Sequence, residues 1–302
     1  MSTLAAIVRL SRSKFLIGGF LSVALGTLIA RYEHHSLSIS AWVIALCTVI
    51  IFQLMTHYSN DYFDLECDVR ATRTPFSGGS GVLQRSELTP VFAGRLALGA
   101  ASLGLLATIL IAFRFSITAA ALAIMSAILS WSYSAPPPRL LARGLGEFTA
   151  ALVVAILGPT FAYAMQTGAI DLRAVLGTIP AACAMFAMML CVEIPDLQAD
   201  EASGKENLLV RFGLPRARRM IELCMLAIFV AAAAAVFAGV APSTFGYFAL
   251  GAAPVAISLW RTLERPNAPG VAIAAHGVLF FAITVGCGAL GYAAAIYSGG
   301  AM

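Results

Sequence analysis

Long apolar stretches, separated by short polar segments, recur along the whole chain. Nine of them have roughly the length of a membrane-spanning helix, and they lie at about 15–30, 41–59, 91–113, 117–134, 148–165, 175–192, 220–240, 244–260 and 271–297. The mean hydropathy of +0.88 is far above that of soluble globular domains. We therefore predict one all-α, polytopic membrane domain over residues 1–302.

The positive charges are distributed unevenly between the polar segments. If the N-terminus lies in the cytoplasm, the N-terminal segment and the second, fourth, sixth and eighth loops, together with Arg95 at the start of the third span, carry 16 of the 19 Lys and Arg residues. Cytoplasmic loops of membrane proteins carry such an excess. The pattern predicts a cytoplasmic N-terminus and an outside C-terminus. A basic cytoplasmic face suits anionic lipid headgroups or a phosphorylated substrate rather than a nucleic acid.

Two clusters of acids follow apolar spans on this same side. In "SNDYFDLECDVR" (59–70), Asn60, Asp64 and Asp68 are four residues apart, so a helix continued through them places all three on one face. In "EIPDLQADEASGKE" (193–206), Asp196 and Asp200 repeat this spacing. Pro195 predicts a bend at that point.

Carboxylates and an amide, without cysteine ligands, favour a hard divalent ion such as Mg²⁺, which commonly also binds substrate phosphates. Two facing clusters of this kind would suit a diphosphate held through metal ions. The remaining negative charge calls for donors among the nearby basic residues: Arg70, Arg73, Arg139, Arg143, Lys205 and Arg211. The alternative, solvated acids at helix ends, explains one such motif better than two at equivalent positions.

The two motifs also suggest an internal repeat, because they lie 132 residues apart and each ends an apolar span. The predicted halves are about 10–140 and 145–265, with 271–297 as a closing helix.

Four further polar residues near the motifs are candidates for contacting an acceptor substrate or supporting the site: Gln53, His57, Asp61 and Glu193. An ionisable side chain within a span is a functional candidate. For His57, a helix-packing hydrogen bond is an equal alternative. Glu147 either binds Arg139 or Arg143 or favours the start of its helix.

The motifs resemble those of the UbiA superfamily of intramembrane prenyltransferases. "NDYFDLECD" is similar to its NxxxDxxxD motif, and "EIPDLQADEASGKENLLVRFG" to its DxxxD motif with the trailing GK and LxVRxG. "FSGGSGVLQRSELTP" and "YSAPPPRLLARGLGE" resemble the 1,4-dihydroxy-2-naphthoate (menaquinone-type) branch. The chain departs from the family at "YSAPPPR", where many members have YxxxK, and at Glu193, where many have Asn.

The resemblance implies about nine helices around a central cavity, capped on the cytoplasmic side by loops 2–3 and 6–7. It implies Mg²⁺ as cofactor, an isoprenyl diphosphate as donor and an aromatic, quinone-precursor-type acceptor, in a bacterial inner (plasma) membrane. The catalytic residues would be Asp64, Asp68, Asp196 and Asp200, which with Asn60 would bind metal. The diphosphate would contact Arg70, Arg73, Tyr133, Arg139, Lys205 and Arg211, with Arg139 taking the place of the missing lysine.

Two other functions remain compatible with the sequence. A terpene cyclase would keep the donor site but close the cation onto its own chain, without an acceptor. An ion-coupled transporter would also place acids at broken helices. Clustering of the acids at one membrane face argues against the transporter.

Overall fold

The computed structural model describes residues 2–34 and 36–299, and these residues form helices joined by turns and loops, without a β-strand. The α-helices are α1 (Thr3–Leu10), α2 (Leu16–His34), α3 (Ile39–Phe63), α4 (Leu65–Asp68), α5 (Pro90–Arg114), α6 (Ile117–Ser134), α7 (Gly146–Ala150), α8 (Gly158–Thr167), α9 (Leu172–Gly177), α10 (Ile179–Glu193), α11 (Leu197–Ala202), α12 (Leu208–Phe237), α13 (Ser243–Ala249), α14 (Ala253–Glu264) and α15 (Gly270–Gly299).

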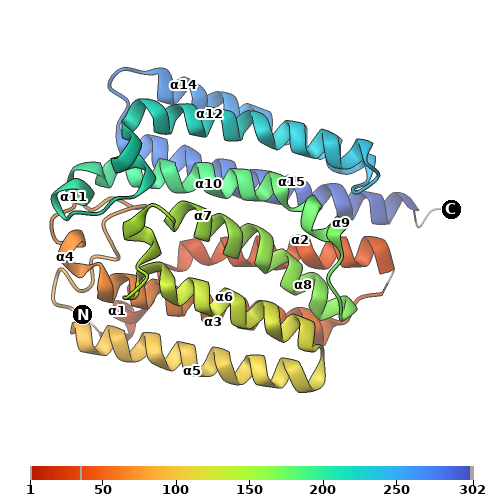
Figure 1. Cartoon of the computed structure of the whole chain (residues 1–302), viewed down its shortest axis with the longest axis horizontal. Coiled ribbons are helices and arrows are strands. Elements are labelled where there is room, and N and C mark those ends of the chain that lie inside the picture. The colour runs from red at the N-terminus through yellow and green to blue at the C-terminus, as the bar shows by residue number, and fades with distance from the viewer. Residues whose placement is uncertain (1, 35, 300–302) are drawn as a thin grey trace.

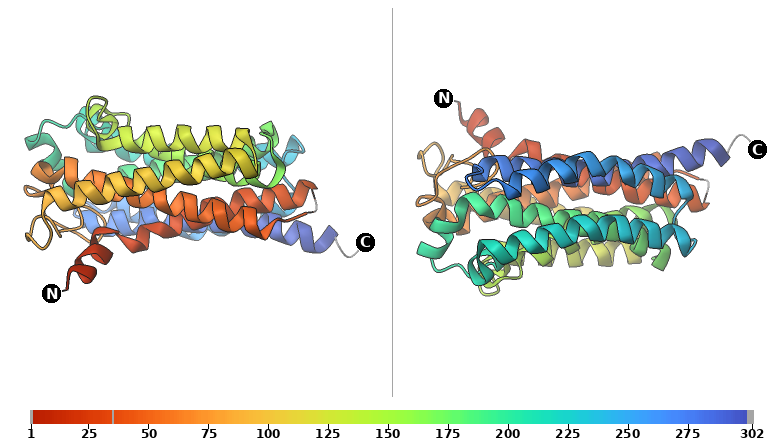
Figure 2. Two further views of the ribbon diagram at one scale, coloured as in Figure 1. Left: turned by 90° about the horizontal axis from the view of Figure 1, so that it is seen from below. Right: turned by 90° about the horizontal axis from the view of Figure 1, so that it is seen from above.

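The long helices run side by side in a single bundle (Figure 1). The short helices α1, α4 and α11 lie at one end, near the N-terminus, and the chain ends at the opposite end. Two further views show the same arrangement, with the loops around α4 and α11 gathered beyond the ends of the long helices (Figure 2). We call the segments 64–89 and 194–207 the cap.

The prediction of nine membrane-spanning helices is confirmed. In the described part of the chain, nine helical segments are long and apolar enough to cross a membrane. The largest difference in boundaries concerns the seventh, predicted at 220–240, because α12 begins at Leu208. Its first turns are separated by a break at Gly213, whose φ of 76° is in the left-handed region that favours glycine. The start of α12 therefore reaches into the cap.

The fifth span contains a π-helical segment, Ala151–Leu157, between α7 and α8. It directly precedes Gly158 and Pro159, and Pro159 has no N–H to donate to the carbonyl four residues earlier. The hydroxyl of Ser22 on α2 donates to the carbonyl of Val154 within this segment. Gly26 lies so close to the backbone of Pro159 that any Cβ there would overlap the carbonyl of Pro159. The fifth span is therefore fixed tightly against α2.

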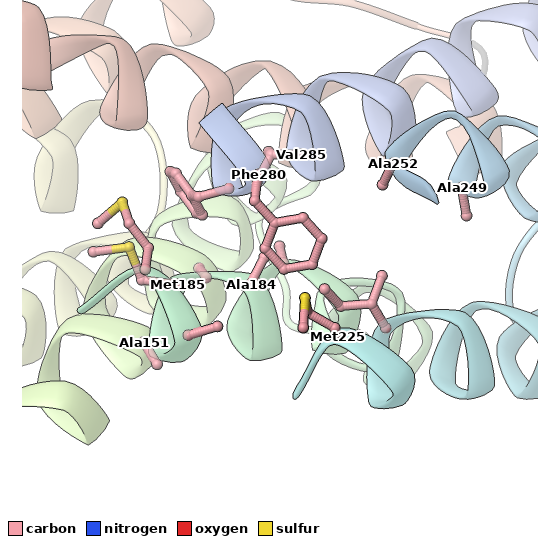
Figure 3. Close-up of a cluster of buried hydrophobic side chains, with 14 of the residues drawn as sticks. Ala151, Ala184, Met185, Met225, Ala249, Ala252, Phe280 and Val285 are labelled. Carbon is pink, nitrogen blue, oxygen red and sulfur yellow. The ribbon is translucent and has the colours of Figure 1, made fainter. Parts of the chain in front are cut away.

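Small side chains let the helices of the C-terminal half approach closely. The cluster of Figure 3 includes several alanines, among them Ala184 on α10 and Ala252 before α14. Phe280 on α15 and Met225 on α12 are among the larger residues of this cluster and are buried. This packing holds α10, which carries the second acid motif, against α12 and α15.

Candidate active site

A cavity of about 300 Å³ lies among α2, α3, α6, the fifth span, α10 and α15, below the cap. Its wall changes in character along the bundle. At the cap end it is lined by both acid motifs and Lys205. Farther along the helices it is lined by apolar side chains, among them Phe52, Val153, Phe161 and Phe281. The cavity therefore joins a charged mouth to an apolar interior.

The first acid motif lies where α3 ends and α4 begins. The helix does not continue unbroken as predicted, because Asp64 has φ −100° and ψ 5°. The spacing of four is nevertheless kept: the N–H of Asp64 donates to the carbonyl of Asn60, and that of Asp68 to the carbonyl of Asp64, both at 2.9 Å. The Asn60 amide donates to Oδ2 of Asp64 at 2.7 Å and to the Ser134 hydroxyl at 2.9 Å. Asn60 thereby orients Asp64, which is buried.

The second acid motif follows α10. The predicted bend at Pro195 is confirmed, because Ile194–Asp196 forms a 3₁₀ turn before α11. Oδ2 of Asp196 accepts from the backbone N–H of Gly78 at 2.9 Å. Its Oδ1 is buried without a hydrogen-bond partner. The two cap segments therefore meet at Asp196, which keeps one oxygen available.

Lys205 connects the two motifs. Its Nζ lies 3.8 Å from Oδ2 of Asp64 and 3.3 Å from Oδ1 of Asp200. Burial lowers the pKa of Lys205, but the two carboxylates outweigh this and raise the pKa above its ordinary value. Burial also raises the pKa of Asp64, although Lys205 and Arg139 oppose that shift. A fixed positive charge thus lies between the two acid motifs.

The predicted diphosphate ligands fall into two groups. Tyr133 and Lys205 line the cavity, and Arg139 lies just outside its wall with Nη2 3.6 Å from Oδ1 of Asp64. Arg70 instead donates to the carbonyl of Ala202 at 2.7 Å, while Arg211 donates to Glu206 at 3.0 Å. Arg73 contributes no atom to the cavity wall and packs against the 78–81 segment.

Three of the four predicted acceptor-site candidates, Gln53, His57 and Glu193, line the cavity. Nδ1 of His57 lies 2.8 Å from the carbonyl of Ser11, and the amide of Gln53 donates to the carbonyl of Phe15 at 3.3 Å. Both side chains therefore secure the turn between α1 and α2 as well as facing the cavity.

The fourth candidate, Asp61, is buried behind the cavity wall and contacts the cap. It accepts from the N–H of Ser80 at 3.1 Å, from the Ser80 hydroxyl and from Arg12. Asp61 therefore holds the 78–81 loop in place.

A sequence model of the UbiA prenyltransferase family matches residues 19–281. The chain belongs to this family. Two curated relatives are 1,4-dihydroxy-2-naphthoate octaprenyltransferases. The one from Bacillus subtilis is 23% identical over 68% of this chain and 65% of its own length. The one from Haemophilus influenzae is 26% identical over 63% and 66%. The matched region thus spans just under two thirds of each relative.

Solved structures of UbiA family members have the same fold at low sequence identity. A UbiA homolog from Archaeoglobus fulgidus bound to DMAPP and Mg²⁺ has a TM-score of 0.70, at 14% identity over 93% of this chain and 98% of that one. An apo UbiA homolog from Aeropyrum pernix K1 has a TM-score of 0.68, at 15% identity over 94% and 98%.

Beyond the family motifs, the cavity is lined by residues that the sequence analysis did not select. Arg12 and Lys14 line its mouth, together with Ser77, Gly78 and Gly79 of the cap. Arg12 also donates to Oδ1 of Asn60 at 3.1 Å. The sequence analysis used the N-terminal basic residues only to orient the chain in the membrane. Unlike the acids, Arg12 and Lys14 do not follow a repeated spacing that would have identified them as site residues.

The donor atoms at the mouth of the cavity fit Mg²⁺. Four carboxylates converge there, and one buried oxygen, Oδ1 of Asp196, has no protein partner. No three His, Cys, Asp or Glu side chains within residues 2–34 and 36–299 are close enough to hold an ion by themselves. Because Mg²⁺ commonly takes only one or two carboxylates and completes its shell with water and substrate phosphates, this set suits an ion bound together with a diphosphate.

Proposed function

We propose that the protein transfers an isoprenyl group from an isoprenyl diphosphate to an aromatic, quinone-precursor-type acceptor within the membrane, with Mg²⁺ as cofactor. One observation carries the proposal: two acid motifs from distant parts of the chain converge on the charged mouth of a cavity whose interior is apolar. A diphosphate suits the mouth, and an isoprenoid chain suits the interior. The names of the relatives from two bacteria support the naphthoate-type acceptor.

The reaction produces a diphosphate anion and an allylic cation, and the two ends of the cavity suit these two species. The C–O bond of the donor breaks, and its electron pair leaves with the diphosphate while the allylic carbon becomes cationic. The carboxylates of the two acid motifs would hold Mg²⁺, which would supply electrostatic stabilisation of the leaving group. Lys205 would add a further positive charge at the same end, and Tyr133, which lines the cavity, would donate a hydrogen bond. The apolar wall excludes water, which would otherwise capture the cation.

The same proposal includes the orientation. The N-terminus and the cap lie at one end of the bundle and the C-terminus at the other (Figure 1). Together with the distribution of Lys and Arg, this favours a cap in the cytoplasm and a C-terminus outside, in a bacterial inner membrane.

The test is to incubate purified protein with Mg²⁺ and dimethylallyl, geranyl or longer allylic diphosphates, with and without 1,4-dihydroxy-2-naphthoate. We expect little diphosphate release without the acceptor and a sharp rise, with a prenylated product, when it is added. Cyclic hydrocarbons formed without an acceptor would make the protein a terpene cyclase instead. Full-length folded protein that releases no diphosphate under any of these conditions would contradict both functions.

Binding of Mg²⁺ with donor is expected to weaken as the pH falls below about 7. Burial raises the pKa of Asp68 to about 7, although Arg12 opposes this shift. Below that pH the ion must displace a proton from Asp68, and above it the carboxylate is already free. The loss of apparent affinity approaches about tenfold per pH unit for one displaced proton.

Titration calorimetry with Mg²⁺ and geranyl diphosphate between about pH 5.5 and pH 8 measures this dependence. The Asp68→Asn variant is the control, because it should bind more weakly and lose most of the pH dependence. A wild-type affinity that stays constant across this range would contradict a role for Asp68 in metal binding.

Replacing Arg139 with alanine is expected to raise the KM for the donor about tenfold, the effect of losing one hydrogen bond to a charged group. Arg139 lies 3.6 Å from Asp64 at the mouth. Arg211→Ala is the matched comparison, because both arginine side chains are 44% exposed but Arg211 pairs with Glu206. Steady-state kinetics with geranyl diphosphate distinguish them. A larger rise in KM for Arg211→Ala would assign the diphosphate contact to Arg211.

A further inference from the structure

The wall of the cavity contains a buried glutamate that accepts no hydrogen bond from an N–H or hydroxyl group of the described residues. Glu193 is the last residue of α10 and is only 6% exposed. No N–H or hydroxyl group donates to either of its carboxyl oxygens, whose one hydrogen-bonding neighbour is the carboxyl group of Glu147, and the side chain lines the cavity. Among the residues that the structure describes, it is the one carboxyl group with both oxygens buried and unpartnered. Leaving such a group unpartnered costs free energy, so a partner is expected to arrive in the cavity.

A second buried glutamate adjoins it. Glu147, in the first turn of α7, is fully buried, and its Oε1 accepts from the N–H of Leu208 at 2.7 Å. This bond ties the fifth span to the start of α12. Glu147 lies in the first turn of α7, as one of the two sequence alternatives requires. Its other oxygen has no N–H or hydroxyl donor and lies within hydrogen-bonding reach of the carboxyl group of Glu193. Two adjacent carboxyl groups can share one proton and keep one negative charge, and that charge can accept a further proton.

The other polar groups facing Glu193 are committed to other contacts. Besides Glu147, the charged groups that interact with Glu193 are Asp200 and Lys205, which pair with one another. Tyr133 on α6 interacts with both glutamates and lines the same cavity. His57, the other ionisable candidate, has Nδ1 at 2.8 Å from the carbonyl of Ser11. Asp196 also has an unpartnered oxygen but belongs to the acid motif at the mouth, so Glu193 is the carboxyl group of the cavity wall outside the two motifs that is left to take a proton.

We infer that Glu193, with Glu147 behind it, accepts the hydroxyl proton of the aromatic acceptor as the new bond forms. The inference rests on the proposed function. The acceptor O–H bond breaks, its proton moves to Glu193, and its electron pair forms a C=O bond. The ring π pair released at the adjacent carbon bonds to the allylic carbon of the donor. The C–O bond of the donor breaks, and its pair leaves with the diphosphate. The alkylated keto tautomer then loses CO₂, or H⁺ to the departing diphosphate, from the same ring carbon. The electron pair left behind restores the aromatic ring, and the ring oxygen takes its proton back from Glu193.

This role separates Glu193 from the residues at the mouth of the cavity. Ionisation of the donor depends on the acid motifs and Lys205, whereas proton acceptance matters only when an acceptor reacts. Glu193→Gln keeps the size of the side chain but removes its basicity. It also leaves the bond between Glu147 and Leu208 in place, so the fold is not expected to change.

The test compares wild type, Glu193→Gln, Glu193→Asp and Glu264→Gln, with geranyl diphosphate and 1,4-dihydroxy-2-naphthoate as probes. Glu264 is an exposed residue of α14, outside the cavity, and serves as the control. We expect Glu193→Gln to lower kcat for prenylation about 100-fold or more, the usual contribution of a general base. The donor KM and the slow acceptor-free diphosphate release should change less than about twofold, and Glu193→Asp should recover part of kcat.

A pH profile provides a readout that a structural role would not change. As the acceptor hydroxyl ionises in solution, Glu193→Gln should regain rate by up to about tenfold per pH unit, because a phenolate needs no base. Wild type should not show this gain. Equal prenylation rates in wild type and Glu193→Gln, or a parallel loss of acceptor-free diphosphate release, would overturn the inference alone. A folded wild type that releases diphosphate but prenylates no phenolic acceptor would overturn the proposed function and the inference with it.

Discussion

Asp64→Asn is expected to lower kcat/KM for the donor about a thousandfold or more, while the protein still folds in detergent. Asp64 lies at the centre of the charged mouth, within 3.6 Å of Arg139 and 3.8 Å of Lys205. Asparagine keeps the shape but removes the negative charge that would hold Mg²⁺ against the diphosphate. Single electrostatic contacts to developing charge are worth about a hundredfold to a thousandfold, and loss of a metal ligand adds to this. Diphosphate release with geranyl diphosphate measures the effect.

Glu66→Gln is the matched control, because Glu66 follows Asp64 by two residues but its side chain is 91% exposed. It should retain nearly full activity. Asp196→Asn should lower kcat/KM for the donor as Asp64→Asn does, because Asp196 of the second motif has an unpartnered oxygen at the same mouth of the cavity. Full activity in both aspartate variants would contradict the assignment of these residues to a metal site.

Lys205→Met is expected to lower kcat/KM for the donor at least about a hundredfold and to destabilise the metal-free protein. Lys205 is buried between Asp64 and Asp200. Removing one partner from a buried ion pair costs about 3–5 kcal/mol when the remaining charge cannot relax. The thermal midpoint without Mg²⁺ should therefore fall by several degrees.

The binding data should show a specific signature for Lys205→Met. Binding of Mg²⁺ alone is expected to persist, because a competing cation has been removed, whereas binding of geranyl diphosphate should weaken. Arg265→Met, at an exposed residue after α14, is the control for loss of a positive charge. Unchanged donor affinity in Lys205→Met would show that its ammonium group stabilises the cap alone.

The number and approximate positions of the spans could be predicted from the sequence because a helix that crosses the membrane needs a long run of apolar residues. The break at Pro195 was also predictable, since proline lacks an N–H. The π-helical segment and the extended start of α12 were not, because both depend on contacts between distant helices. Gly26 against Pro159 and Glu147 against Leu208 are examples. The internal repeat remains a prediction from the spacing of the acid motifs.

For the site, the spacing of Asn60, Asp64 and Asp68 correctly indicated residues that lie together at the cavity. The functions of these residues remain predictions. Basic residues were harder to place, because an arginine carries the same charge whether it faces the cavity or, like Arg70, a backbone carbonyl on the outside. Arg12 escaped notice because the positive-inside pattern already accounted for it. The sequence gives the sign of a side chain's charge, but it does not give the direction in which a long side chain points.

The π-helical segment Ala151–Leu157 sets the angular register between the two ends of the fifth span. A π turn accommodates one more residue than an α turn, and each residue of an α-helix turns the chain by about 100°. Deleting one residue here would let the span become a regular α-helix while α7 and α8 kept nearly the same faces toward their neighbours. Glu147 would then stay beside Glu193 and Leu208, and Pro159 would stay packed on Gly26. A homologous chain that lost the π turn without losing a residue would instead turn α7 by about 100° and present a different face of it to the same cavity.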